Sequence, residues 1–291
     1  MIARLRQIWR AGRIVVHILA AFPLAILFLP LKQKRHSAFQ QRLIAWWLAD
    51  LCRIMHVRMC IRGKPVSEPA LLVANHISWL DIPLLASAWQ GRFLSKADVA
   101  EWPVIGWLLR RTGTLLIRRG ARRGAEQAID DISRTLQNSE SVCLFPEGTT
   151  TNGDRVLRFH PRLFQAACRT AALVQPVMLR YPEAAGLSAT VPFIGDDEFV
   201  SHLLQLLRQP EIEAELVFLP ALDAAGQLPD HLADAAHAMI SWALNPRLVS
   251  KPAELPIITG STGSDPRYHA VYTGNGPTLR QPAHADTPAL N

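Results

Sequence analysis

The alternation of short strand-like runs with helix-like segments from Val57 onward restricts the fold more than any other feature of this sequence. Apolar or alternating runs of strand length occur at Val57–Ile61, Leu71–Ala74, Arg92–Ser95, Thr114–Ile117, Ser141–Phe145, Val174–Leu179 and Glu213–Leu219. Helical periodicity falls between and after them, at Trp102–Arg111, Ala125–Gln137, from Pro161, and at His231–Leu244. Strands separated by helices pair mainly in parallel, so residues 57–247 are predicted to form an α/β domain with a mixed, largely parallel sheet flanked by helices.

The segment before Val57 has a different composition. Residues 1–64 contain 12 Lys or Arg and one acid, Asp50, although the whole chain has a net charge of only +7. An apolar run from Ile14 to Leu31 is interrupted by Pro23, and Phe39–Met55 has an amphipathic helical pattern. We therefore expect residues 1–56 to form a membrane-associated pair of helices. This distribution favours an anionic membrane surface over nucleic acid as the partner, and a soluble helical hairpin that covers the core is the alternative.

Two further regions bear on organisation and metal binding. Residues 248–291 are rich in Pro, Gly, Thr and Ala, which predicts a disordered tail. The four cysteines have no C-x-x-C or zinc-like spacing, so we expect buried thiols and no metal site.

The candidate catalytic residues follow the strand-like run Leu71–Ala74. The run breaks at Asn75 into a polar turn with His76 and, after four intervening residues, Asp81. We expect a helical turn to place these two side chains on one face, so that Asp81 accepts a hydrogen bond from one imidazole nitrogen of His76. The other nitrogen would then be basic and able to take a proton from a hydroxyl group. A structural histidine in a capped turn is the alternative.

Two other strand ends carry residues suited to binding an anion. Phe145–Thr150 passes from a strand into a polar loop, where Gly148 permits close backbone approach and Glu147 could bond a substrate hydroxyl or an arginine. Gly113–Arg119 delivers Arg118 and Arg119 at its end, and forked guanidinium groups match phosphate geometry. An ordinary turn and a solvated basic face are the respective alternatives.

Together these segments resemble the glycerolipid acyltransferases typified by lysophosphatidic acid acyltransferase. The similarity runs well from about Arg58 to Tyr181 and more loosely to about Leu244. Four segments resemble the four ordered family blocks: Asn75–Asp81, Gly113–Arg119, Phe145–Thr149 and Val174–Val177. The stretches Ser95–Lys96 and Trp102–Trp107 are also similar to the family.

The resemblance implies transfer of an acyl group from an acyl thioester, acyl-CoA or acyl carrier protein, to the free hydroxyl of a lysolipid. His76 would be the general base and Asp81 the residue that orients it. The predicted acceptor-binding residues are Arg119, Arg118, Lys96, Glu147, Gly148 and Thr149. The resemblance further implies that no metal or other cofactor is needed, and that the enzyme works at the cytoplasmic face of a bacterial inner membrane.

The preferred acceptor at this stage is 1-acyl-sn-glycerol 3-phosphate, which would give phosphatidic acid. The sequence departs from the family pattern at Thr150, where an arginine is common, and at Leu116 and Arg118, where Phe and an acid often occur. The missing arginine opens an alternative acceptor, lyso-ornithine lipid. A serine hydrolase is disfavoured because there is no G-x-S-x-G motif, and a non-catalytic membrane-binding protein is the weaker alternative.

Overall fold

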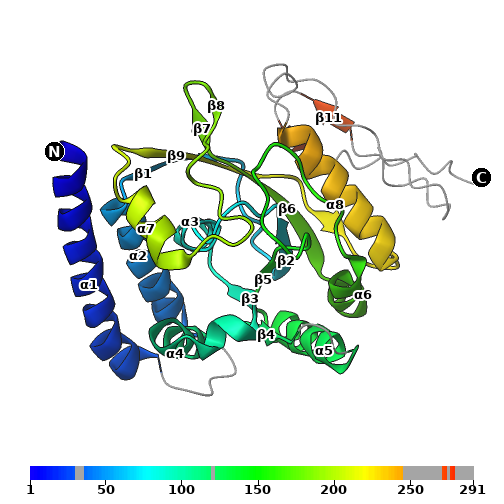
Figure 1. Cartoon of the computed structure of the whole chain (residues 1–291). Helices are drawn as coiled ribbons and strands as arrows, with labels where there is room; N and C mark the ends of the chain where they lie inside the picture. The colour runs from blue at the N-terminus through cyan, green and yellow to red at the C-terminus, as the bar shows by residue number, and fades with distance from the viewer. Residues whose placement is uncertain (30–35, 119–121, 245–270, 274–275, 279–291) are drawn as a thin grey trace, which may run out of the picture. The chain divides into compact units, whose positions relative to one another are not determined.

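The computed structural model describes residues 1–29, 36–118, 122–244, 271–273 and 276–278 (Figure 1). The chain divides into two compact units, Met1–Leu244 and Asn245–Asn291. The tail predicted to be disordered lies outside the described residues, apart from a short antiparallel pair of strands, β11 (Val271–Thr273) and β12 (Gly276–Thr278).

A mixed sheet forms the centre of the first unit and confirms the predicted fold class. Within the described part of the chain it has eight strands, in the order β1-β9-β6-β2-β5-β3-β4, with β10 beside β6. Strands β6, β2, β5, β3 and β4 are parallel neighbours, whereas β9 and β10 run antiparallel to β6. The strand bounds are Val57–Arg62 (β1), Ala70–Ala74 (β2), Arg92–Lys96 (β3), Leu115–Ile117 (β4), Val142–Leu144 (β5), Leu173–Arg180 (β6), Ile212–Phe218 (β9) and Leu222–Asp223 (β10). A small hairpin, β7 (Pro182–Glu183) with β8 (Gly186–Leu187), follows β6.

Helices cover both faces of the sheet. The helix bounds are Ile2–Phe28 (α1), Ala38–Ile54 (α2), Asp81–Ala88 (α3), Pro103–Arg111 (α4), Arg122–Gln137 (α5), Gln165–Thr170 (α6), Phe199–Leu206 (α7) and Pro229–Leu244 (α8), with 3-10 turns η1 (Ala97–Glu101) and η2 (Pro161–Phe164). Side chains of β2 alternate between the two sides, as a strand with period two requires. Leu71 and Val73 pack in one core with α5, α6 and α8, while Leu72 and Ala74 pack in another with α3.

Helix α1 is continuous through Pro23, so the basic start and the apolar run belong to one helix. Polar side chains of α1 donate to backbone carbonyls of the segment that follows α7. Arg10 donates to the Gln209 carbonyl at 2.7 Å and to the Pro210 carbonyl at 3.1 Å. Its other side exposes large apolar residues, among them Leu5 and Trp9. Among the described helices α1 is the one long and apolar enough to cross a membrane, yet it lies along the domain beside α2 (Figure 1).

Candidate active site

The strand order brings the predicted site residues to one edge of the sheet. Because β2, β5, β3 and β4 are parallel neighbours, their carboxyl ends lie at the same edge. His76 follows β2, Glu147 follows β5, Lys96 ends β3, and Arg118 follows β4. From β2 to β4 is three strand spacings, roughly 14 Å. The predicted residue Arg119 lies outside the described residues.

The predicted pair of His76 and Asp81 is in contact: imidazole Nδ1 lies 2.7 Å from carboxylate Oδ2. The predicted helical turn between them is wrong, because residues 75–78 are non-helical and Asp81 is the first residue of α3. Residues five positions apart on a helix would point in different directions. A non-helical segment with a tight turn, in which Asp81 N–H donates to the Ser78 carbonyl at 3.1 Å, folds the chain back and brings the two side chains together.

Asp81 is fully buried and accepts hydrogen bonds from several neutral donors besides His76. The backbone N–H groups of Ile77 and Ser78 donate to Oδ2 at 2.7 and 3.0 Å. The Tyr181 hydroxyl donates to Oδ1 at 2.6 Å, from the end of β6. Burial, with the Asp81 charge next, raises the pKa of Tyr181 well above its usual value, so this hydroxyl keeps its proton. These bonds hold a buried carboxylate in one orientation without neutralising its charge.

Tyr181 is a site residue that the sequence did not predict. Its bond to Asp81 joins positions 100 residues apart, and no local spacing encodes such a contact. Its position in the sequence does point to the site, because Tyr181 comes two residues after the predicted strand Val174–Leu179, at the edge where the other site residues were expected.

Besides its contact with Asp81, the imidazole of His76 packs against an aromatic ring and is partly exposed. The ring stacks on Phe145, with 3.9 Å between ring centroids and 15° between planes. The side chain is 18% exposed, and within the described residues Nε2 has no hydrogen-bond partner. With Nδ1 bonded to the carboxylate, Nε2 is the nitrogen that can accept a proton from a bound hydroxyl.

The loop after β5 binds the backbone at His76 through the Glu147 carboxylate. Glu147 accepts bonds from the backbone N–H groups of His76 and Leu157, both at 2.7 Å. Burial raises the pKa of the Glu147 carboxyl group against the effect of these two bonds. Gly148 has a φ of 71°, which favours glycine, and Thr149 is exposed. The Thr150 hydroxyl, where the family often has arginine, donates to the Phe193 carbonyl.

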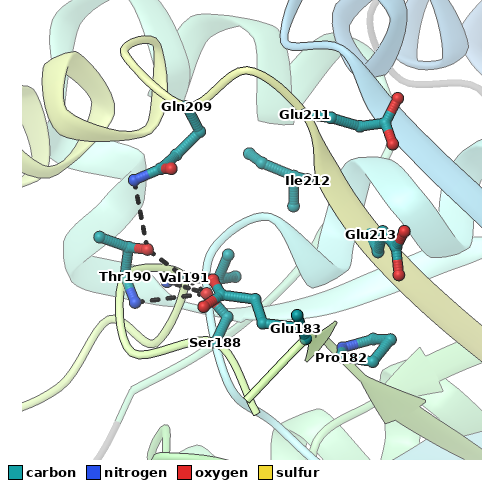
Figure 2. A pocket seen from close by; sticks show the side chains of 10 residues that line it. Pro182, Glu183, Ser188, Thr190, Val191, Gln209, Glu211, Ile212 and Glu213 are labelled. Carbon is teal, nitrogen blue, oxygen red and sulfur yellow. Dashed lines mark hydrogen bonds between the residues drawn. The ribbon is translucent and has the colours of Figure 1, made fainter. Parts of the chain in front are cut away.

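No predicted site residue lines either of two hollows in the described structure. A mainly apolar cavity of about 200 Å³ is lined by residues of α2, α3, α4 and β3. Its wall includes Ile82, Ala86, Phe93, Ile105 and Leu108. A more polar hollow of about 350 Å³ lies beyond β6 (Figure 2), where Gln209 donates to Thr190 at 3.3 Å and Glu183 and Glu213 line the wall. In the part of the chain that is described, no group of three or more His, Cys, Asp or Glu side chains is placed to hold a metal ion.

Comparisons with known proteins show the family of the chain. A family model described as Acyltransferase matches residues 53–180, which span the sheet strands β1 to β6 and the His76–Asp81 pair. The chain is 38% identical over 247 residues to a lyso-ornithine lipid O-acyltransferase of Pseudomonas aeruginosa, covering 83% of this chain and 95% of that protein. It is 30% identical over 187 residues to a 1-acyl-sn-glycerol-3-phosphate acyltransferase of Neisseria gonorrhoeae, covering 62% of this chain and 73% of the relative.

A solved structure shares the fold. The crystal structure of the 1-acyl-sn-glycerophosphate acyltransferase of Thermotoga maritima superposes with a TM-score of 0.63 at 19% identity, covering 86% of this chain and 97% of that one.

Proposed function

The chain belongs to the glycerolipid acyltransferase family and is an O-acyltransferase that acts on lysolipids, and we propose that its acceptor is lyso-ornithine lipid. The single observation that carries the catalytic part is the 2.7 Å contact between His76 Nδ1 and the buried Asp81 carboxylate, with Nε2 left open. A base held in this way suits deprotonation of a hydroxyl at neutral pH.

In the proposed reaction His76 Nε2 takes the proton of the acceptor hydroxyl as its oxygen attacks the thioester carbonyl. Asp81 stabilises the imidazolium that forms and keeps the proton of Nδ1 in place. When the tetrahedral intermediate collapses, the carbon–sulfur bond breaks and the proton on Nε2 passes to the leaving thiolate. The products are an ester and a free thiol. A thioester is already activated, so the step calls on no further nucleophile from the protein.

The acceptor head group is the part of the proposal that the relatives inform most. Four relatives at 32–39% identity are named lyso-ornithine lipid O-acyltransferases, whereas the two Neisseria relatives named for 1-acyl-sn-glycerol 3-phosphate are 30% identical. Both acceptors fit these names. We put lyso-ornithine lipid first because the Pseudomonas relative matches over 95% of its length and because Thr150 replaces an arginine suited to phosphate.

We further propose roles for the remaining predicted site residues. Arg118 and Lys96 lie at the carboxyl edge of the sheet, where cations would attract the anionic part of the acceptor or the donor. Arg119 keeps the same proposed role from its place in the sequence. Gly148 and Thr149 would border the acceptor, whereas both carboxylate oxygens of Glu147 already accept backbone bonds and so support a positioning role.

We propose that the enzyme is bound to a lipid membrane, at the cytoplasmic face of a bacterial inner membrane. The support is α1, whose exposed side is apolar and whose sequence carries four arginines before Ile14. The acyl donor, acyl-CoA or acyl carrier protein, would reach the site from the cytoplasm. The apolar cavity between α2 and α4 is of a kind that accommodates part of an acyl chain.

An acceptor screen tests the proposal. Membranes containing the protein or its His76→Ala variant are supplied with labelled acyl-CoA or acyl carrier protein and with lyso-ornithine lipid or lysophosphatidic acid. We expect transfer to lyso-ornithine lipid that falls by about 100-fold or more in the variant. Transfer to lysophosphatidic acid alone would reverse the acceptor assignment. No histidine-dependent transfer to either would favour a non-catalytic membrane-binding protein.

A further inference from the structure

A patch of exposed apolar side chains lies outside α1, on segments that contact the loop carrying His76. It lies on two segments far apart in the sequence, the start of α4 and the region of α7. Its members are Trp102 (40% exposed), Val104 (37%), Ile194 (43%), Val200 (54%) and Leu204 (37%). We call these five residues the α4–α7 patch. Val200 and Leu204 are four positions apart in α7, so they lie on one face of that helix.

Aromatic contacts join the two halves of the patch to the catalytic loop. Phe199 lies between Trp102 and Trp79, with ring centroids 5.3 and 5.1 Å apart. Trp79 is three residues beyond His76 in the sequence. The patch is therefore attached to the chain segment that carries the base.

Hydrogen bonds attach the other end of the patch to the same loop. The Phe193 N–H donates to the Ile77 carbonyl at 2.9 Å, and the Phe193 carbonyl accepts a bond from the Thr150 hydroxyl. Ile194, the next residue, thus stands beside both loops of the site, after β2 and after β5.

Helix α1, whose exposed side we have proposed to contact lipid, touches both segments that carry the patch. Helix α1 touches α7 through Gln7, which donates to the Leu204 carbonyl at 3.0 Å, and touches α4 through Phe22 and Trp107, whose rings stack at 4.9 Å. In Figure 1 α7 and α4 both lie next to the α1–α2 pair. Exposed apolar side chains on three helices in contact suit one shared lipid surface.

We infer that the α4–α7 patch is a second lipid-contact surface, which places the mouth of the active site on the leaflet so that a lysolipid acceptor reaches His76 without crossing water. The inference rests on the proposed function, because it assigns the entry route of that acceptor. Charge decides which lipid surface it suits. Asp196, Asp197 and Glu198 lie beside Ile194 and Val200, so contact at the patch comes from apolar insertion and needs no anionic lipid, unlike contact through the exposed Arg4 and Arg13 of α1.

A paired activity assay tests the inference. The variant Val200→Ser/Leu204→Ser changes exposed side chains on the outer face of α7, and Leu228→Ser is its matched control. Leu228 is 60% exposed and lies between β10 and α8. Strand β10 pairs with the amino end of β6, away from the carboxyl edge where His76 lies. Each protein is assayed with the acceptor in phosphatidylcholine vesicles and with a short-chain acceptor dispersed in solution.

We expect the double variant to lose about tenfold or more of the initial rate on vesicles and to keep the rate on the dispersed acceptor within about twofold. The Leu228→Ser control should match the wild type in both assays. Equal losses in the two assays would overturn the inference, because the patch would then serve the folded site itself. An unchanged vesicle rate, or a loss seen with a carrier-protein donor and absent with acyl-CoA, would overturn it as well.

A measurement without turnover separates failure of this inference from failure of the proposed function. An environment-sensitive fluorophore is attached at Val200→Cys in a Cys60→Ser background, since Cys60 is exposed and would otherwise react. Addition of phosphatidylcholine vesicles should shift its emission to shorter wavelength, and the same label at Leu228→Cys should not shift. If the wild type transfers no acyl group while the Val200 label still shifts, the proposed function fails and the lipid contact stands. No shift at Val200 overturns the contact whatever the activity.

Discussion

Two histidine–carboxylate pairs lie at opposite edges of the sheet, and they differ in what else the carboxylate binds. At the carboxyl edge Asp81 contacts His76 and otherwise accepts bonds from a tyrosine hydroxyl and two backbone N–H groups. At the amino edge Glu140 lies 3.9 Å from His36 Nδ1 and forms an ion pair with Arg92 at 2.6 Å. Both carboxylates are essentially buried.

The difference explains why one histidine suits catalysis and the other does not. Arg92 neutralises Glu140, so little negative charge remains to stabilise a protonated His36. Burial, and then the Arg92 charge, lower the pKa of His36 below its usual value. Asp81 has no cationic partner among the described residues other than His76, so no fixed cation offsets its charge beside that imidazole. Neutral donors orient the Asp81 carboxylate and leave its charge available to the adjacent imidazole, which supports the role proposed for His76.

The largest effect is expected from Asp81→Asn, which keeps the shape of the carboxylate and removes its charge. Turnover should fall by about 10³- to 10⁴-fold, because the amide no longer stabilises the imidazolium or fixes the tautomer. Single-turnover assays with labelled acyl donor measure the loss, and circular dichroism checks that the variant is folded. A loss below about tenfold would mean that the two pairs do not differ in the way described.

The matching change at the other edge, Glu140→Gln, should act on stability. It removes the Glu140 charge from the ion pair with the largely buried Arg92 guanidinium, and breaking such a buried pair costs about 3–5 kcal/mol. Urea unfolding followed by tryptophan fluorescence gives the free energy of unfolding. Turnover per folded molecule should stay within about tenfold of the wild type. A larger loss would mean that the His36–Glu140 pair also takes part in catalysis, against the difference described above.

A smaller effect is expected from Tyr181→Phe, which removes one neutral donor from Asp81 and keeps the ring. A hydrogen bond to a charged group is worth about 1.5–3 kcal/mol, so kcat/KM should fall by roughly tenfold or more. In an Asp81→Asn background the same change should cost little more, because the hydroxyl acts through the carboxylate. Additive losses in kcat/KM would indicate that Tyr181 only packs against the site.

The smallest effect concerns His36→Gln and pH. The folded-state pKa of His36 is lowered, so below about pH 6.5 the unfolded chain binds a proton that the folded chain does not. Wild-type stability should therefore fall as the pH drops from 7.5 toward the lowered pKa, and the variant should show a shallower fall. Parallel urea titrations at pH 7.5 and 5.5 compare the two slopes. Equal slopes would mean that His36 carries a charge at pH 5.5 without cost.

The sequence predicts most of the parallel core and the two central site residues, and the reasons are local. Strands such as β2 and β6 are mainly apolar and bounded by breakers, and His76 and Asp81 lie two and seven residues after the end of β2. Helices α3 and α7 were not predicted: each has eight residues, and α3 contains Pro83, so neither shows two full turns of clear periodicity. Short helices of this kind form because the surrounding fold packs them.

Contacts over long sequence distances account for the rest of the site. Tyr181 and Asp81, His76 and Glu147, and Phe193 and Ile77 meet because parallel strands end at one edge, and no spacing in the sequence encodes those pairs. Which carboxylate had an arginine beside it was equally hidden, since Arg92 and Glu140 lie 48 residues apart.

The docking of α1 onto the carbonyls after α7 has a consequence for the order of events during synthesis. Arg6 donates to the carbonyl of Arg208, 202 residues later in the chain. At about 5–20 residues per second, a ribosome makes this helix roughly 10 to 40 s before its acceptor carbonyls exist. Strand β1 waits in the same way for β9, its neighbour in the sheet. With the lipid surface proposed above, the nascent helix meets the bilayer first, and the catalytic domain is completed on a chain that is already tethered there.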